Sequence, residues 1–478
     1  MKNCIYNRYF NIFTIAILAI SLTICQPIGA NILFVLKNNN EQRITTETNI
    51  YDLLIIAPEE YTSLLKPLVA HKNNVGVITN LVSLSEVYAQ STLGRDNPEK
   101  IKIYIKKAYE NWDIKYVMLV GNFRKMPVRY VYNDEPWQGY PEPYFISDLY
   151  YADIIDSYGN YSSWDTNNNG IYGEWKGEVA QDQPIDLRPD VYVGRLACRN
   201  KIEVKILVKK IMTYETTTYD KYWFKKIVGV GGDTYPDGQY DFPTPEYEGE
   251  ENLRLMFENM TGFEHIELFT STGNFTGPLD IIRAFNKGAG FFAFDGHANP
   301  KTWSTHPPND KKNWTNGLNL FTISFLMNRD KYPIVVAGAC HNNEFDVNLL
   351  NWLEDPHDAY YYGIGAFECW GWKLTRKIGG GAIACIANTG LGMSKEDKST
   401  RNGAGDYMDL QFFYEYGTNK TDILGECWGK AINRYLDAFP IDWNSPSAWD
   451  YAYDCKTVQQ WLLLGDPSLK IGGYSLGL

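Results

Sequence analysis

The sequence predicts an α/β fold made of two related halves with mostly parallel sheets. The first observation is a rhythm in which short apolar runs of strand length alternate with stretches of helical length. The second is that this rhythm occurs twice along the 478 residues, at 51–218 and again at 219–478. Strands that alternate with helices pair in parallel, so we expect each half to be a doubly wound α/β subdomain.

The first half carries one long interruption. Residues 122–189 break the rhythm and are rich in Tyr, Asp, Asn, Gly and Pro. A connection of this length is uncommon unless it has a function, so we expect a structured excursion. The expected strands of this half are 52–57, 75–79, 116–121 and 190–195, and the expected helices are 61–73, 98–111 and 201–216.

The second half repeats the pattern without such an interruption. Two of its apolar strands run directly into a reactive residue, because His297 follows one and Cys340 follows another. The expected strands are 226–231, 265–269, 290–295, 333–338 and 381–387, and the expected helices are 279–287, 318–327 and 423–439.

The N-terminus has the pattern of a secretory signal peptide. Lys2 and Arg8 precede an apolar stretch at 10–25, and small residues follow up to Ala30. We expect a signal peptide at 1–30, a short leader at 31–50, and a secreted or cell-surface protein. An uncleaved anchor and a lipidated Cys25 are the alternatives. No later stretch is apolar enough to cross a bilayer, so no transmembrane domain is expected in the mature chain.

The composition excludes some classes of partner. Hydrophobic residues make up 44% and charged residues 21%, which is typical of a globular protein. The net charge of −12 argues against nucleic acid, because phosphate binding needs a basic face.

Six of the eight cysteines remain after removal of the signal peptide. None forms a Cys-x-x-Cys pair, so zinc is not expected. Six cysteines can form three disulfides, or at most two if one cysteine is a nucleophile, and the sequence leaves the connectivity open.

His297 and Cys340 are the candidate catalytic pair. In a parallel sheet, functional groups gather at the carboxyl ends of the strands, so neighbouring strands would bring both side chains to one crevice. A cysteine peptidase needs a thiolate nucleophile and a histidine that removes its proton. The backbone N–H groups of Gly296 and Cys340 are candidates for an oxyanion hole.

Three further residues could assist or compete with this pair. A carboxylate should orient the imidazole, and Asp295 and Asp148 are the two candidates. His341 is a competing base, although the side chain of an adjacent residue is expected to point away from Cys340. The alternative for Cys340 and His297 themselves is a buried cysteine and an ordinary polar histidine.

Several motifs together resemble the gingipain-type cysteine peptidases, which share the caspase fold. Gly296–Trp303 is similar to their histidine motif and Ala337–Phe345 to their nucleophile motif, and matching stretches occur at 147–153, 189–196 and 464–469. The resemblance implies a caspase-like second half and endopeptidase activity on protein or peptide substrates, without an organic cofactor. One departure is Ala298, where the family usually has glycine, and alanine there would cost on the order of 1 kcal/mol if the position needs a positive φ.

The resemblance to basic-specific members implies cleavage after Arg or Lys. Such a pocket needs a buried carboxylate, and Asp186 is the candidate by position in the sequence. Trp370 and Trp372 are candidate pocket walls. The alternatives are a solvated loop carboxylate for Asp186 and core positions for the two tryptophans.

Residues 165–174 have the pattern of a calcium loop. Oxygen-bearing side chains at alternate positions precede Gly170, and calcium is also what the resemblance implies. The alternative is a plain Asn-Gly turn, since Lys176 stands where an EF-hand has its closing glutamate. The expected ligands are Asp165, Asn167, Asn169, Ile171 and Glu174.

Two other functions stay open. A catalytically inactive member could act as a binding protein, and a transpeptidase could use the same Cys-His pair to join the acyl group to an amine.

Overall fold

The computed structural model describes residues 50–134, 142–236, 247–394, 403–445 and 449–475. Thr48–Leu478 form one compact unit, which contains both expected halves. The boundary between the halves remains a prediction. The expected signal peptide and all but the last residue of the expected leader lie outside the described residues. Within the described ranges, no helix combines the length and apolar character that a membrane crossing requires.

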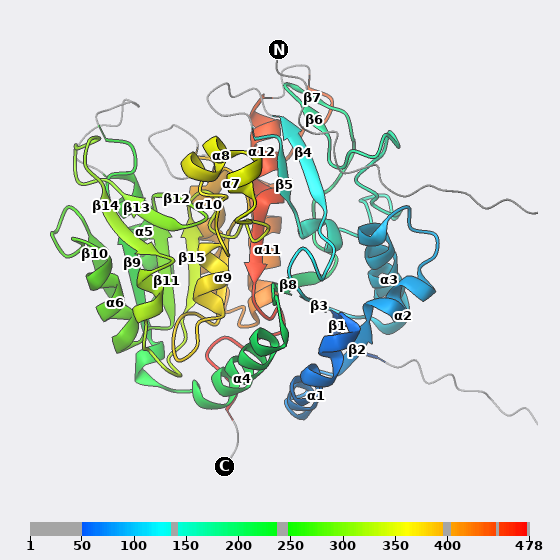
Figure 1. Ribbon diagram of the computed structural model, residues 1–478, viewed down its shortest axis with the longest axis horizontal. Helices are drawn as coiled ribbons and strands as arrows, with labels where there is room; N and C mark the ends of the chain where they lie inside the picture. The colour runs from blue at the N-terminus through cyan, green and yellow to red at the C-terminus, as the bar shows by residue number, and fades with distance from the viewer. Residues whose placement is uncertain (1–49, 135–141, 237–246, 395–402, 446–448, 476–478) are drawn as a thin grey trace, which may run out of the picture. The chain divides into compact units, whose positions relative to one another are not determined.

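One ten-stranded sheet runs through the unit, in the order β10-β9-β11-β15-β16-β17-β8-β3-β1-β2 (Figure 1). The α/β class and the mostly parallel pairing are confirmed, but the two halves share this sheet instead of forming one each. The strands of the first half are β1 (Leu53–Ala57), β2 (Thr79–Ser83), β3 (Tyr116–Val120) and β8 (Tyr192–Leu196). Those of the second half are β9 (Lys226–Gly231), β10 (Glu264–Phe269), β11 (Phe291–Asp295), β15 (Ile334–Gly338), β16 (Ala384–Asn388) and β17 (Trp461–Leu464).

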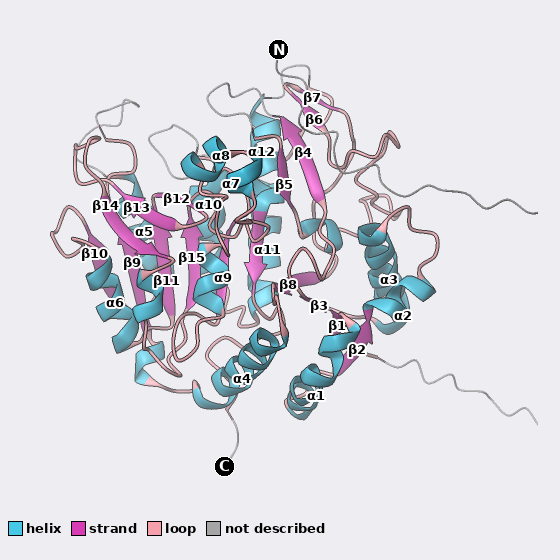
Figure 2. Ribbon diagram, viewed as in Figure 1, coloured by secondary structure: helices cyan, strands magenta, loops and turns pink. Residues whose placement is uncertain are grey.

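The central strands are buried on both faces because helices cover the sheet. Every residue of β1, β3, β11 and β16 is buried, which explains why these strands read as continuous apolar runs. Figure 2 shows the helices around the strands. The helices are α1 (Glu59–Asn74), α2 (Leu84–Gln90), α3 (Asn97–Trp112), α4 (Lys201–Thr217), α5 (Glu248–Asn259), α6 (Pro278–Lys287), α7 (Asn351–Glu354), α8 (Pro356–Tyr361), α9 (Trp370–Thr375), α10 (Ala404–Phe413), α11 (Leu424–Ala438) and α12 (Trp449–Gln460).

The two halves of the sheet run in opposite directions. β17 pairs with β16 in antiparallel fashion and with β8 in parallel fashion. The carboxyl ends of β11 and β15 therefore lie at one edge of the sheet, and those of β1, β3 and β8 lie at the other. β17 was not among the expected strands, so this reversal follows from the structure alone.

Two small sheets lie beside the large one. The three-stranded sheet contains β12 (His297–Asn299), β13 (Thr302–Thr305) and β14 (Thr315–Asn319), and it carries the histidine motif. The four-stranded sheet belongs to the long excursion and contains β4 (Tyr130–Asp134), β5 (Tyr144–Ile146), β6 (Trp175–Lys176) and β7 (Val179–Ala180).

Two expected elements are wrong or displaced. The expected helix 318–327 is instead the end of β14 followed by a 3₁₀ turn, Thr322–Phe325. The Asn319 side chain accepts hydrogen bonds from the N–H groups of the second and third residues after it, and this local bonding competes with a helix. The expected strand 75–79 begins only at Thr79, because Gly76 adopts a positive φ where α1 ends.

Candidate active site

The sheet brings the two reactive residues to one edge. β11 and β15 are adjacent parallel strands, and Asp295 is paired with Gly338. His297 and Cys340 each lie two residues beyond that pair. The sequence argument required these two strands to be neighbours, and in the structure they are, so that both residues follow the same carboxyl edge.

His297 is held by a backbone carbonyl. Its Nε2 lies 2.7 Å from Thr234 O, and since a carbonyl oxygen only accepts, Nε2 carries the hydrogen. The other ring nitrogen, Nδ1, then has a free lone pair. Burial lowers the pKa of His297, the bond to Thr234 opposes this, and His306 lowers the pKa further. The resting imidazole is therefore neutral at pH 7.

Aromatic rings surround this imidazole. The ring centroids of Tyr235, His306 and Trp314 lie 5.8, 5.9 and 5.4 Å from that of His297, each close to perpendicular. His306 in turn packs on Trp314 with ring centroids 3.7 Å apart.

Cys340 differs from the other five described cysteines because it alone is partly exposed. Its thiol donates a long hydrogen bond of 3.8 Å to Gly392 O. Burial raises the pKa of Cys340 to about 11, with a smaller upward effect from Glu142 and opposing effects from Gly392 and Lys456. The resting Cys340 side chain is thus a thiol, and a base would have to remove its proton before it could act as a nucleophile.

Tyr235 packs against His297. The pKa of its hydroxyl is raised well above its usual value by burial, by Asp406 and by Cys340. The hydrogen bonds of His297 and Cys340 go to backbone carbonyls instead of to each other.

Neither candidate for the orienting carboxylate bonds to His297. Asp148 forms a bidentate pair with Arg195, at 2.6 and 2.7 Å, in the first half of the sheet. Asp295 accepts from Asn252 at 2.7 Å and from the Thr234 hydroxyl at 3.5 Å. Asp295 therefore reaches His297 only indirectly. It accepts from the Thr234 hydroxyl, and the Thr234 carbonyl accepts from His297 Nε2.

Thr234 was missed by sequence reasoning. It follows β9, which lies directly beside β11 in the sheet. The sequence did contain a signal for Thr234, because a third apolar strand runs into Gly-Gly-Asp-Thr at the same edge of the sheet.

His341 lies among carboxylates. Its Nδ1 is 2.9 Å from Glu344 Oε2 and 3.5 Å from Glu142 Oε1. Burial by itself lowers the pKa of His341, but Glu142 and Glu344 outweigh it and raise the pKa to about 9. A histidine that is already protonated at pH 7 is a poor base, so this geometry favours His297.

The two oxyanion-hole candidates differ in availability. Gly296 N–H donates to Gly338 O at 3.4 Å, which continues the ladder between β11 and β15. Cys340 N–H makes no backbone hydrogen bond among the described residues. Ala298 is paired with Trp303 in β12 and is not a residue with positive φ, so replacing the family's glycine costs no left-handed strain.

Each of the candidate pocket residues has contacts of its own. Asp186 precedes β8, and β8 lies three strand positions from β15, which is roughly 14 Å. Its carboxylate accepts from Arg188 N at 3.1 Å. Trp370 and Trp372 are both core residues, bonded through Nε1 to Leu318 O and to a Glu203 carboxylate oxygen.

Glu142 is a carboxylate from the long excursion that raises the pKa of Cys340, by a smaller effect than burial. It accepts from Leu391 N at 2.7 Å and lies 3.5 Å from Nδ1 of His341, the residue after Cys340. Glu142 lies in the long excursion, just before β5. Nothing in its sequence surroundings connected it with a strand end more than 190 residues away along the chain.

The expected calcium loop closes on itself. The Nδ2 groups of Asn167 and Asn169 lie 3.2 and 2.6 Å from Glu174 Oε2. The carboxylate of Asp165 accepts from Asn169 N and Gly170 N, at 2.9 and 3.1 Å. Four of the five expected ligands are thus drawn together by direct side-chain contacts, and Ile171 N joins them through Asn169 Oδ1 at 2.8 Å.

All six described cysteines are free thiols, and five of them are buried. None of the disulfides that the cysteine count allows is formed among them. Burial raises the pKa of each of these five thiols. Because the thiolate is the reactive form, these thiols are unreactive.

Comparisons with known proteins show which proteins this chain resembles. The chain is 23% identical over 428 residues to gingipain R2 of Porphyromonas gingivalis (strain ATCC BAA-308 / W83), covering 88% of this chain and 46% of that protein. It is 21% identical over 217 residues to Lys-gingipain W83 of the same species, covering 44% of this chain and 12% of that protein. The chain therefore spans less than half the length of these relatives.

Solved structures share the caspase-like fold. A crystal structure of the Arg-specific cysteine proteinase gingipain R (RGPB) matches with a TM-score of 0.59 and 18% identity, over 89% of this chain and 79% of that one. A complex of the Porphyromonas gingivalis RgpB pro- and mature domains matches with a TM-score of 0.60 and 17% identity, over 88% and 79%. The model of peptidase family C25 matches residues 46–472, and the chain belongs to that family.

Proposed function

We propose that this protein is a secreted or cell-surface cysteine endopeptidase that cleaves protein or peptide substrates with Cys340 and His297. The observation that carries the proposal is the pairing of β11 with β15, which gives both residues the same position at one sheet edge. The neutral imidazole and the protonated thiol are the states from which general-base activation starts.

The reaction follows from the free lone pair on His297. Nδ1 removes the thiol proton as the sulfur attacks the substrate carbonyl carbon, and the Cys340 N–H stabilises the oxygen that gains charge. The imidazolium then gives its proton to the leaving amine, which leaves a thioester on Cys340. Water, deprotonated by the same imidazole, hydrolyses the thioester and restores the thiol.

Substrate preference is proposed to be for Arg or Lys before the scissile bond. A buried carboxylate favours a matching cation and disfavours an apolar group that leaves it unpaired. Asp186 was the sequence candidate, and Glu142 is a second candidate because it lies 3.5 Å from His341, the residue after Cys340, and raises the pKa of Cys340.

A structural calcium ion is proposed for the loop around Asp165, Asn167, Asn169, Ile171 and Glu174. The donor set suits calcium, since it consists of carboxylate and amide oxygens. Glu174 Oε1 is buried and forms an ion pair with the Lys176 ammonium. Asp165 is paired with Arg95, so calcium would compete with two cationic side chains for these carboxylates.

A mixed peptide library tests the proposed activity. Cleavage sites should appear with wild-type protein and vanish with Cys340→Ala, while the Cys385→Ala control, which changes a buried thiol, keeps the cleavage pattern. Adding a free amine separates the alternatives, because a transpeptidase would yield amine-capped products in place of hydrolysed ones. A wild-type protein that cleaves nothing and binds intact peptides would favour the non-catalytic alternative.

A further inference from the structure

A buried polar group lies directly behind the catalytic edge of the sheet. Asp295 ends β11 and is paired with Gly338, which ends β15. His297 and Cys340 each follow this pair by two residues. The contacts that hold the two strand ends therefore also set how the imidazole lies relative to the thiol.

Helix α5 contacts the end of β11 through a single amide side chain. Asn252 is only 1% exposed, and its Nδ2 donates to Asp295 Oδ2 at 2.7 Å and to Asp409 Oδ1 at 3.2 Å. Gly249, one turn earlier in α5, permits this close approach, because a Cβ there would lie 3.0 Å from Asp295 Oδ1 and 2.8 Å from Thr234 Oγ1. Asn252 thus forms an amide bridge between Asp295 on β11 and Asp409 on α10.

Asp409 lies against the end of the other strand. A Cβ on Gly338 would lie 2.5 Å from Asp409 Oδ2, so a larger residue at 338 would displace this carboxyl group. Asp409 is fully buried, and within the described part of the chain its Oδ2 has no hydrogen-bond partner. Packing against β15 and the bond to Asn252 therefore hold this side chain in place.

The two carboxyl groups favour an uncharged form. Burial raises the pKa of Asp295, and Asp406 raises it further, while the bond from Asn252 opposes both. Burial also raises the pKa of Asp409, followed by the effects of Asp295 and Asp406. Two buried carboxyl groups that share one amide donor cannot both ionise at low cost. An amide of the same shape is therefore a close replacement for the carboxyl group at position 409.

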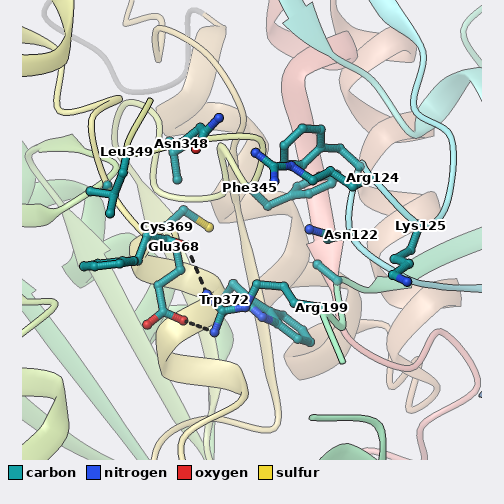
Figure 3. Close-up of a pocket in the computed structure, with 15 residues that line it drawn as sticks. Asn122, Arg124, Lys125, Arg199, Phe345, Asn348, Leu349, Glu368, Cys369 and Trp372 are labelled. Atoms are coloured by element: carbon teal, nitrogen blue, oxygen red, sulfur yellow. Dashed lines mark hydrogen bonds and ion pairs between the residues drawn. The ribbon is translucent and has the colours of Figure 1, made fainter. Parts of the chain in front are cut away.

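The bridged residues contact protein groups and line no described cavity. The cavity of about 280 Å³ in Figure 3 lies elsewhere, where Arg124 and Arg199 are among the lining residues. Asn252, Asp295 and Asp409 are at most 4% exposed. They can therefore influence a reaction only by placing the residues that touch the substrate.

We propose that Asn252 and Asp409 are positioning residues for the catalytic pair. Together with Asp295, they hold the ends of β11 and β15 so that His297 lies within reach of Cys340. This inference rests on the proposed peptidase function. A displacement of about 1 Å between reacting groups can cost about 10²-fold in rate, so small shifts of the strand ends matter.

Two substitutions remove the amide bridge and a third preserves it. Asn252→Leu removes both N–H donors at similar volume, and Asp409→Ala removes one acceptor. Each should lower kcat on a peptide substrate by at least about tenfold and change KM less than about threefold, because the bridge does not touch the substrate. Asp409→Asn keeps the shape of the side chain and should recover most of the activity that Asp409→Ala loses.

Asn259→Leu is the matched control. Asn259 lies at the other end of α5, where its Nδ2 donates to Leu255 O at 3.0 Å. The variant should keep kcat within about twofold of the parent, even if its melting temperature falls. Melting curves of all four variants identify those that fold.

Histidine NMR provides a readout that needs no turnover. The chain has six histidines, and the His297 Nε2–H signal can be assigned by its loss in His297→Ala. Since this N–H donates to Thr234 O, the signal reports where the imidazole lies. It should shift in Asn252→Leu and stay in place in Asn259→Leu.

The outcomes separate this inference from the peptidase proposal. If the parent protein cleaves nothing, the peptidase proposal fails and the His297 signal alone decides whether the bridge positions the imidazole. The inference is overturned if folded Asn252→Leu keeps the parental kcat and His297 signal, or if Asn259→Leu lowers kcat as much. If Asn252→Leu does not fold, equal kcat in Asp409→Ala and Asp409→Asn overturns it.

Discussion

The surroundings of His297 and His341 are opposite in character, aromatic for the first and acidic for the second. On one side, aromatic rings and a backbone carbonyl surround His297, and burial lowers its pKa. On the other side, two carboxylates surround His341 and raise its pKa to about 9. The same residue type thus becomes a neutral base on the aromatic side and a fixed cation on the acidic side. Chemical role here follows the neighbours of a residue in space more than its distance from the nucleophile along the chain.

The largest expected effect is a difference in kcat/KM between variants of His297 and variants of His341. His297→Ala should lower kcat/KM by about 10²–10⁴-fold, which is the usual contribution of a general base. His341→Gln should lower it less than tenfold, because its ring is bonded to carboxylates instead of the thiol. Kinetics on one peptide substrate, with melting curves to verify folding, checks both. Equal losses in the two folded variants would remove the distinction.

The next effect concerns the acidic side and substrate choice. Glu142→Gln should lower kcat/KM on Arg substrates by about tenfold or more, equivalent to about 1.4 kcal/mol, and change little on substrates with an uncharged residue there. Asp186→Asn is the matched control and should have less effect, because Asp186 precedes β8, a strand that lies three strand positions, or roughly 14 Å, from β15. If Asp186→Asn loses more kcat/KM on Arg substrates than Glu142→Gln does, Asp186 and not Glu142 is the pocket carboxylate.

A third prediction concerns the protonation state of the pair. Since the pKa of Cys340 is raised to about 11, the thiolate fraction grows about tenfold with each pH unit up to that value. The rate of alkylation by iodoacetamide should therefore rise steadily between pH 7 and pH 10. Mass spectrometry should find the label on Cys340, as the other described thiols are buried. A rate that is flat from low pH would indicate a thiolate–imidazolium pair instead.

The smallest expected effect concerns the long excursion. Calcium should raise the melting temperature by about 2 °C or more, because an ion that binds only the folded state stabilises it. Arg95→Gln removes the cation that competes for Asp165 and should enlarge the calcium-dependent shift. Scanning calorimetry with chelator and with calcium measures this. Identical curves after the chelator has removed any bound ion would contradict the calcium site.

Local patterns in the sequence predicted much of the fold. Continuous apolar runs such as Phe291–Asp295 and Ile334–Gly338 are buried strands, as expected. The helix 318–327 could not be read correctly, since a single side chain, that of Asn319, redirects the backbone into a turn. β17 was missed because it is a short apolar segment of only four residues directly after a helix.

The sequence by itself determined which residues could react and that two apolar strands would deliver them. A strand pattern is local, and burial follows from residue type, so His297 and Cys340 could be found without coordinates. Only the tertiary structure decided what surrounds them. Thr234 comes from the adjacent strand, where Gly-Gly-Asp-Thr was the available signal, and Glu142 comes from the distant excursion without any signature along the chain. The same holds for the reversed direction of the two halves, because strand order is fixed by how distant segments pack together and not by any one of them alone.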